Sequence, residues 1–375
     1  MIRYVAAALL AFFAFHVEAQ RIEVNGAKVP LPDGNVLGVA LDEGQGMFFV
    51  QQSVLSPGAN GRGISSRLQI TSWGLQNHSL IKQRTFPEAA AGASAFPCDR
   101  VEASAESRRV YVCSAGSRLD IIDPNSLTTV GTMAQADGQA ITDFAVDDAH
   151  GRVLVLSAQR DGSIHLASYS LQKGEKQQDA VVSTANSTRM SLAVAPRTGQ
   201  IGISLDVPNR AGNKADIYTC TDSPDLVCSK IAETDAVSQM SFLGRQMLVA
   251  TSIFADNKKD CILTVDPMTR AVSREYCSPS TGVHYAVGVA DKAYVIGFTG
   301  ISKRNWFSEE NKSVASSFSI WRAENPQAAA VAKDPTDYGA FQNEIRVVAS
   351  STRPIFIAYQ RVSNLLCLYS IVDRN

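Results

Sequence analysis

Short runs of alternating apolar and polar residues, separated by tight turns, recur along most of the chain. The clearest series has four runs, at residues 100–105, 109–113, 118–123 and 128–133. They are rich in β-branched and aromatic residues or alternate in polarity, as strands do. Turn-forming residues separate them, notably in the segment Asp123-Pro-Asn-Ser126. The pattern predicts one four-stranded antiparallel sheet, which cannot bury both of its faces without neighbouring copies.

The chain contains seven copies of this four-strand unit. The second strands are the most alike: MFFVQQ, RVYVCS, RVLVLS, QIGISL, QMLVAT, KAYVIG and PIFIAY. The first strands are predicted to begin at Val36, Arg100, Ile141, Arg189, Val237, His284 and Ile345. Four of the six intervals between these starts are 41, 48, 48 and 47 residues long. Propeller blades repeat about every 40–50 residues. The sequence therefore predicts an all-β fold, a seven-bladed β-propeller of four-stranded antiparallel blades.

The two ends of the chain complement each other. Three strands are predicted in the last unit, at 345–350, 355–360 and 365–372, while one additional strand, at 21–29, precedes the first unit. An open strand edge invites pairing with another chain, so propellers need a way to close the ring. We expect the N-terminal strand to complete the seventh blade. Two sandwich domains, the competing interpretation, explain neither the extra strand nor the fixed repeat.

The second unit resembles a known family. Its run VYVCSAGSRLDIIDPNSLTTVGT (110–132) is similar to the YVTN-type repeat of seven-bladed, lactonase-like propellers, with a Tyr-Val strand, a small-residue turn, an Ile-Asp strand end and a Thr-Val return strand. Cys113 and Ser114 stand where the family motif has Thr-Asn, and the other units keep only the apolar alternation. The resemblance implies the propeller fold. No catalytic residue of the family matches a position in this chain.

The first 19 residues have the features of a secretory signal peptide. Arg3 supplies a positive charge, residues 4–15 are apolar, and small residues precede Gln20 at Val17 and Ala19. An uncleaved membrane anchor is the alternative, but 12 apolar residues are too few to span a bilayer. We expect cleavage before Gln20, a single propeller domain over 20–375, no membrane span in the mature chain, and a secreted or periplasmic protein.

Six of the seven cysteines oppose each other across predicted hairpins. The pairs are Cys98 with Cys113, Cys220 with Cys228, and Cys261 with Cys277. The midpoint of each pair falls in a predicted turn, and opposed strand residues lie within disulfide reach. We predict these three disulfides and a buried thiol at Cys367. A metal site would need converging Cys and His ligands, and the sequence has no CxxC or paired-His motif.

The charge composition narrows the partner classes. Thirty-five Lys and Arg residues and 36 Asp and Glu residues give a net charge of −1, without runs of like charge. This balance gives no electrostatic reason to expect nucleic acid or an anionic membrane as a partner. The sequence also lacks haem, zinc-protease, serine-hydrolase, EF-hand and phosphate-loop motifs. We expect no cofactor, no metal, and a monomer that binds a protein or a small molecule.

Long connections are predicted on one face of the ring, here called the long-loop face, where the second-to-third and fourth-to-first connections emerge. They are residues 56–66, 87–97, 207–214, 254–260, 299–316 and 334–343. The opposite face, with the first-to-second and third-to-fourth turns, is the short-turn face. Long loops on a rigid scaffold usually carry binding. Arg304, Trp306 and Phe307 form a cationic-aromatic cluster suited to a ring or a partner protein, or alternatively a lid over the blade.

The central channel supplies the second set of candidates, the polar residues of the first strands. They are Arg100, Asp143, Arg189, Gln239, His284 and Arg346. An Asp among arginines beside a His suits a small anion, or hydrolysis with a base and an electrostatic stabiliser. Asp143, His284 and Arg346 are then the candidate catalytic residues. Ion pairs between blades are the structural alternative.

Two functions of different classes follow from these candidates. The first is a binding or scaffold module that acts through the long-loop face, with Arg100, Arg189 and Gln239 added at the channel mouth. The second is a lactonase-like hydrolase with its site at that mouth, by analogy of fold. A cofactor-linked redox role is a third possibility. The sequence leaves open whether the chain is an enzyme.

Overall fold

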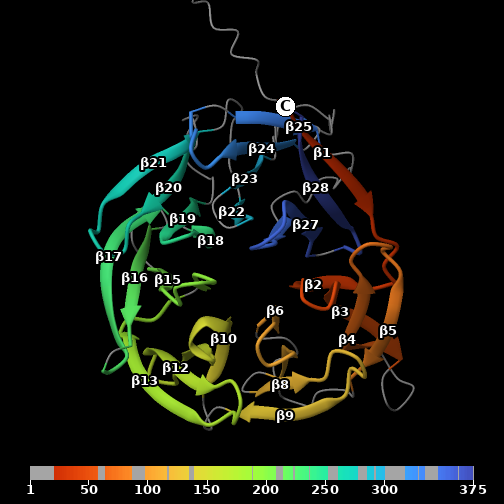
Figure 1. The fold of residues 1–375 in the computed structure, drawn as a ribbon. Helices are drawn as coiled ribbons and strands as arrows, with labels where there is room; N and C mark the ends of the chain where they lie inside the picture. The colour runs from red at the N-terminus through yellow and green to blue at the C-terminus, as the bar shows by residue number, and fades with distance from the viewer. Residues whose placement is uncertain are drawn as a thin grey trace, which may run out of the picture.

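Seven four-stranded antiparallel sheets stand around a central axis in the computed structural model (Figure 1). The structure describes residues 21–57, 64–86, 98–115, 118–134, 139–187, 189–207, 214–222, 224–235, 237–251, 261–277, 285–290, 293–299, 317–327, 329–333, 345–361 and 363–374. In blades 1 to 6 the four strands follow one another from the channel to the rim as a meander, and in blade 7 the rim strand comes from the N-terminal end of the chain. The predicted fold class is confirmed.

The strands of blades 1 to 7 occupy four concentric positions. The innermost strands are β2 (Asn35–Asp42), β6 (Val101–Ser104), β10 (Ala140–Asp147), β14 (Met190–Val194), β18 (Val237–Leu243), β22 (Tyr285–Val289) and β26 (Ile345–Ala349). The second strands are β3 (Met47–Pro57), β7 (Arg109–Ala115), β11 (Arg152–Ala158), β15 (Ile201–Asp206), β19 (Gln246–Thr251), β23 (Tyr294–Thr299) and β27 (Ile355–Gln360). The third strands are β4 (Ile64–Gly74), β8 (Arg118–Ile122), β12 (Ile164–Ser170), β16 (Lys214–Thr221), β20 (Cys261–Val265), β24 (Ser317–Arg322) and β28 (Leu366–Arg374). The outer strands are β5 (Leu80–Thr85), β9 (Thr129–Ala134), β13 (Lys176–Ser183), β17 (Val227–Asp235), β21 (Val272–Cys277), β25 (Ala329–Lys333) and β1 (Arg21–Lys28).

The predicted strand starts agree with the structure, and one hairpin differs. Every innermost strand begins within one residue of its predicted start. The β3–β4 hairpin is longer than predicted, because its ladder continues to Pro57 and Ile64 where a loop was expected from residue 56 to 66. Ser53 and Ser66 hydrogen-bond through their hydroxyls across this extension, which helps to hold the two strands together. The side chain of Leu55 is 74 % exposed on it.

The N-terminal strand closes the ring, as predicted. β1 pairs antiparallel with β28 along its whole length, from Arg21 opposite Arg374 to Lys28 opposite Cys367. The seam continues where the Val29 amide donates to the Leu366 carbonyl at 2.9 Å. Figure 1 shows this red first strand beside the blue last strands. The seventh sheet is therefore built from both ends of the chain.

The last strand is also tied to blade 6. The Tyr294 hydroxyl of β23 donates a hydrogen bond to the Asp373 carboxylate of β28. Arg322 Nη2 of β24 lies 2.7 Å from the same carboxylate. Burial, together with the hydrogen bond and the negative charge of Asp373, raises the pKa of Tyr294 to about 12. The tyrosine is therefore a neutral donor at physiological pH, and the seam carries polar links as well as a strand ladder.

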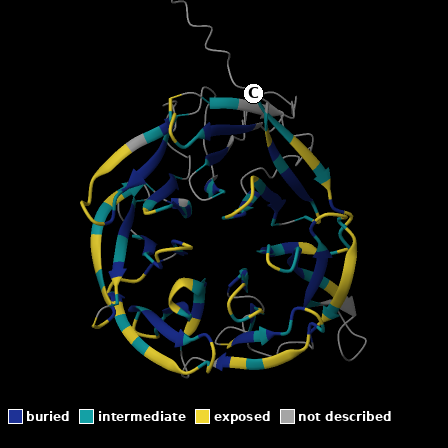
Figure 2. Ribbon diagram, in the orientation of Figure 1, coloured by how far each residue is buried: buried dark blue, intermediate teal, exposed yellow. Residues whose placement is uncertain are grey.

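The hydrophobic core lies between neighbouring blades. Each sheet buries its apolar residues against the next sheet, as between blades 6 and 7, where Ile296 and Phe318 meet Val347, Phe356 and Tyr369. The rings of Phe318, Phe356 and Tyr369 have centroids 4.8–5.1 Å apart, a spacing typical of aromatic packing. Figure 2 shows buried residues along the inner strands and exposed ones along the rim. Inner strands such as β11 are therefore buried on both faces, whereas rim strands such as β13 are largely exposed.

The three predicted disulfides are present. Cys98 bonds to Cys113 within blade 2, with Cα atoms 5.9 Å apart. The other pairs join β16 to β17 and β20 to β21, with Cα separations of 4.1 and 4.0 Å: Cys220 with Cys228, and Cys261 with Cys277. Cys367 keeps its thiol and is 1 % exposed on β28. Six cysteines thus staple three hairpins inside single blades.

Peptide mapping should reproduce these pairs. Digestion under non-reducing conditions is expected to yield three linked peptides, one for each pair, because every bond joins two cysteines of the same blade. Cys367 should react with an alkylating reagent after unfolding but not before, since burial shields the thiol. The measurement is mass spectrometry with and without denaturant. A crossed pairing would contradict the strand register described above.

The predicted signal peptide, residues 1–19, lies outside the described residues. Among the described residues, no helix is long and apolar enough to cross a membrane.

Candidate functional site

Two candidate residues of the channel, Arg100 and Asp143, meet in a polar cluster between blades 2 and 3. Arg100, directly before β6, places Nη1 at 3.1 and 3.2 Å from the two carboxylate oxygens of Asp143 on β10. Its Nε donates to Glu102 at 2.6 Å. The side chains are partly covered, with 29 % of Arg100 and 14 % of Asp143 exposed. The structure thus brings together two residues that lie on different blades.

This cluster extends to the backbone of a third blade. Arg100 Nη1 donates to the Leu192 carbonyl of β14 at 2.7 Å. The Leu192 amide in turn donates to Asp143 Oδ2 at 2.7 Å, and the Phe144 amide donates to Asp143 Oδ1 at 2.9 Å. Both oxygens of Asp143 therefore accept an amide and face the guanidinium. The contacts match the inter-blade ion pairs that were the structural alternative for these residues.

Bulges aim the side chains that make these links. The innermost strands of blades 1, 3 and 5 each carry a register shift, directly before Gly38, Asp143 and Gln239. A bulge kinks a strand and redirects the following side chain. Gln239 Nε2 uses this position to reach the Val347 carbonyl of blade 7 at 3.0 Å. At Gly38 a Cβ would lie 2.8 Å from the Asp99 carbonyl, so blade 2 approaches too closely there for any side chain.

A third link of this kind crosses blade 1. Arg361, after β27 of blade 7, forms an ion pair with Asp99, before β6 of blade 2. Burial lowers the pKa of Arg361. Like Arg100 and Gln239, this side chain reaches the blade after the next one. Long polar side chains therefore bridge alternate blades around the channel.

Electrostatics around Arg100 favour the ion pairs. Burial alone would lower the pKa of Arg100, but the charges of Glu102 and Asp143 outweigh it and raise that pKa. Burial raises the pKa of Glu102, against the opposing effect of Arg100. Arg100 therefore stays charged, and burial favours the protonated form of Glu102 relative to an exposed glutamate.

The remaining predicted residues are spread along the chain. Arg189 is exposed before β14, near Asp206, whose pKa is raised by burial and lowered by this arginine, with a net rise. Arg346 on β26 donates from Nη1 to the Ile345 carbonyl at 3.3 Å. His284, Arg304, Trp306 and Phe307 lie outside the described residues. Within the described ranges, no group of three His, Cys, Asp or Glu residues could hold a metal ion.

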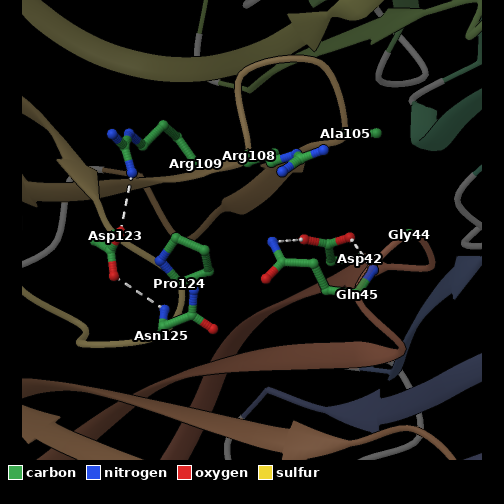
Figure 3. A pocket seen from close by; sticks show the side chains of 9 residues that line it. All are labelled: Asp42, Gly44, Gln45, Ala105, Arg108, Arg109, Asp123, Pro124 and Asn125. Atoms are coloured by element: carbon green, nitrogen blue, oxygen red, sulfur yellow. Dashed lines mark hydrogen bonds and ion pairs between the residues drawn. The ribbon is translucent and has the colours of Figure 1, made fainter.

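In the described part of the chain, two hollows lie away from the channel, one on each face of the ring. One, of about 400 Å³, lies on the long-loop face beside the ring seam and is lined by Lys28, Val29, Pro30, Leu31 and Asn364. The other, of about 570 Å³, lies on the short-turn face between blades 1 and 2 (Figure 3) and is lined by Asp42, Gly44, Gln45, Ala105, Arg108, Arg109, Asp123, Pro124 and Asn125.

The second hollow was missed from the sequence, because its walls are short turns and loop length was the criterion for a site. A signal was nevertheless present. Arg108 stands immediately before the second strand of blade 2, where blades 1 and 3 have Gly46 and Gly151.

Comparisons with known proteins define the class of this chain by fold. No protein-family model and no curated protein matches it. The crystal structure of RRP9 WD40 repeats superimposes with a TM-score of 0.59 at 9 % identity, covering 94 % of this chain and 100 % of that one. The structure of U3-55K gives 0.57 at 9 % identity, covering 92 % and 98 %.

At this identity the likeness shows the fold alone. The chain is a seven-bladed propeller similar in fold to WD40 repeat rings. The comparisons do not confirm that the chain belongs to the YVTN-type, lactonase-like family that the second unit resembles.

Proposed function

We propose that this propeller is a binding or scaffold module, which holds a protein or a small molecule on its long-loop face. The observation that carries the proposal is that both carboxylate oxygens of Asp143 are already hydrogen-bonded. Asp143 is the acid expected to serve hydrolysis in the channel. Its two oxygens accept amides of Phe144 and Leu192 and pair with Arg100. A general base needs a lone pair directed at its substrate, so these contacts favour a structural role for the channel acid.

The proposed binding surface combines predicted and described residues. Arg304, Trp306 and Phe307 are the proposed anchors, with Arg100, Arg189 and Gln239 at the channel mouth. On the same face the structure places exposed Leu55 on the β3–β4 hairpin and the hollow that begins at Lys28. A face that presents both an exposed apolar side chain and a lysine suits a partner of mixed polarity, as is common at protein interfaces. Three disulfides accord with the proposed secretion or periplasmic export.

Replacing both Arg304 and Trp306 with alanine should weaken binding of the partner by at least about 2 kcal/mol, because arginine and aromatic anchors dominate interface energies. The partner would first be recovered by cross-linking the native protein and identifying the product by mass spectrometry. Calorimetric titration then measures the affinity. Thermal stability should stay nearly unchanged, as for most surface substitutions.

The matched control is Arg270→Ala, an exposed arginine on the short-turn face, which should leave the affinity unchanged. Lower stability with intact binding would show that the predicted cluster is a packing lid and would contradict this site.

The hydrolase alternative is tested with a panel of lactones and esters. A binding module should turn over none of them above the rate in buffer. Turnover that is lost in a stably folded His284→Ala variant would contradict the binding proposal and support a catalytic site at the channel mouth.

A further inference from the structure

The hollow between blades 1 and 2 is walled by three turns of the short-turn face. They are the β2–β3 turn with Gln45, the β6–β7 turn with Ala105 and Arg108, and the β8–β9 turn with Pro124 and Asn125 (Figure 3). Its volume is about 570 Å³, within the range of small-molecule and peptide side-chain sites. The proposed function does not use it, because it lies on the other face of the ring.

Both carboxylates of the hollow are already satisfied. Asp42 accepts hydrogen bonds from the backbone amide and the side-chain amide of Gln45, at 3.0 and 2.8 Å. Asp123 pairs with Arg109 at 3.0 Å and also accepts from the Asn125 amide and from Ser126. Those hydrogen bonds, chiefly from Ser126, lower the pKa of Asp123. Neither acid is therefore left to attract a cation from solution.

Arg108 is the charge that remains. Its side chain is exposed, and no hydrogen bond or ion pair joins it to another residue within the described ranges. Figure 3 accordingly draws its guanidinium in the hollow without a dashed line. The nearest acid along the turn, Glu106, is directed to blade 3, where its Oε1 lies 3.7 Å from the Cβ position of Gly151. The hollow therefore holds an uncommitted guanidinium among groups that are already paired.

The backbone at Arg108 is unusual for its position. Its φ is 52°, in the left-handed region that favours glycine. Gly46 and Gly151 take the equivalent place in blades 1 and 3, with φ of 65° and 61°. The repeat thus has an arginine where glycine would fit the turn with less strain. Such outliers persist when the surroundings hold them in place and often mark function.

Hydrogen bonds from blade 3 hold this turn in place. Ser104 Oγ accepts from the Ser107 amide at 2.9 Å and donates to Asp148 Oδ1 at 2.5 Å. The Ala105 amide donates to Asp148 Oδ2 at 2.8 Å. The base of the Arg108 side chain is therefore fixed before any ligand arrives, which lowers the entropic cost of binding.

We propose that this hollow binds a carboxylate group. Arg108 is its bidentate anchor, and the exposed side-chain amide of Asn125 is a second donor. A guanidinium matches the planar geometry of a carboxylate. The two acids and two arginines of the hollow cancel in charge, so a monoanion fits better than a phosphate dianion, which the two acids would repel. The carboxylate belongs either to a small organic acid or to an acidic residue of a peptide.

The test is calorimetric titration of the full chain with matched probes. Butyrate, a monoanion, is compared with butyramide, and a capped peptide Ala-Ala-Glu-Ala, which carries one carboxylate, with the same peptide carrying Gln. Each carboxylate probe that binds should do so at least about tenfold more tightly than its neutral partner. Binding of butyrate alone identifies an organic-acid site, and tighter binding of the Glu peptide identifies a peptide site. Equal affinity, or no binding, within both pairs overturns the proposal.

Two variants connect the binding to Arg108. Arg108→Gly should lower the affinity for the preferred carboxylate probe at least about tenfold. The melting temperature should stay equal or rise, because glycine adopts the left-handed backbone conformation without strain. Arg108→Gln keeps a long polar side chain and should lose affinity to a similar extent.

The control is Arg270→Gly, the same change at an exposed arginine with φ of 60° in a turn of blade 5. It should bind the probe like the wild type. Wild-type affinity in Arg108→Gly, or an equal loss in Arg270→Gly, overturns the proposal. The Arg304→Ala, Trp306→Ala double variant should keep carboxylate binding, which separates this site from the long-loop face.

Discussion

Removal of residues 21–31 should turn a cooperatively unfolding protein into an aggregating chain. The deletion takes away β1, which pairs with β28 over its whole length, and Val29, which is fully buried. The loss of a strand ladder and of apolar burial amounts to roughly 5 kcal/mol or more, comparable to the entire stability of a typical domain. It also leaves the long edge of β28 open to pairing with other copies. Circular dichroism melting and light scattering measure the two effects.

Two controls make this result specific to the seam. A chain that begins at Gln20 should melt cooperatively, since it keeps β1 intact. A synthetic peptide of residues 21–31 added in trans should restore solubility to the shortened chain, because it can refill the same edge. If the shortened chain is as soluble and stable as the full one, closure by the N-terminal strand is not required.

Replacing Asp143 with alanine should lower the free energy of unfolding by about 3 kcal/mol. The change removes one acceptor of the Arg100 guanidinium and the side-chain acceptor of the Phe144 and Leu192 amides, in a partly buried place. Removing one partner of a buried ion pair costs about 3–5 kcal/mol, and the partial exposure of these side chains argues for the lower end. Urea denaturation followed by fluorescence measures the change.

Matched variants separate charge from packing. Asp143→Asn keeps an oxygen acceptor and should lose about half as much stability, whereas Asp161→Ala, an exposed acid that accepts locally from Ser163, should lose less than about 0.5 kcal/mol. Unchanged stability in Asp143→Ala would contradict the structural role. If that variant also lost an esterase activity, the hydrolase alternative would gain support.

Local pattern determined the blades. Alternation of apolar and polar residues has a period of two in a strand with one face toward a core, so the starts of the innermost strands were predicted to within one residue. The cysteine pairs could also be predicted from the sequence, because two residues opposed across a hairpin lie at about equal distances from its turn. Cys220 and Cys228 stand directly opposite each other for this reason. The unpaired first strand and the three-stranded last unit likewise indicate closure of the ring from the sequence alone.

Tertiary structure decided the contacts between blades. Arg100 and Asp143 lie 43 residues apart. The local sequence around neither residue predicts that Arg100 contacts both Asp143 and Leu192. The result depends on the angle between neighbouring sheets and on the bulge before Asp143, both of which arise from ring packing. The same holds for the hollow around Arg108, which exists because turns from two blades end side by side. Sequence alone determines what each hairpin does with its own residues, whereas geometry of the ring determines which hairpins meet.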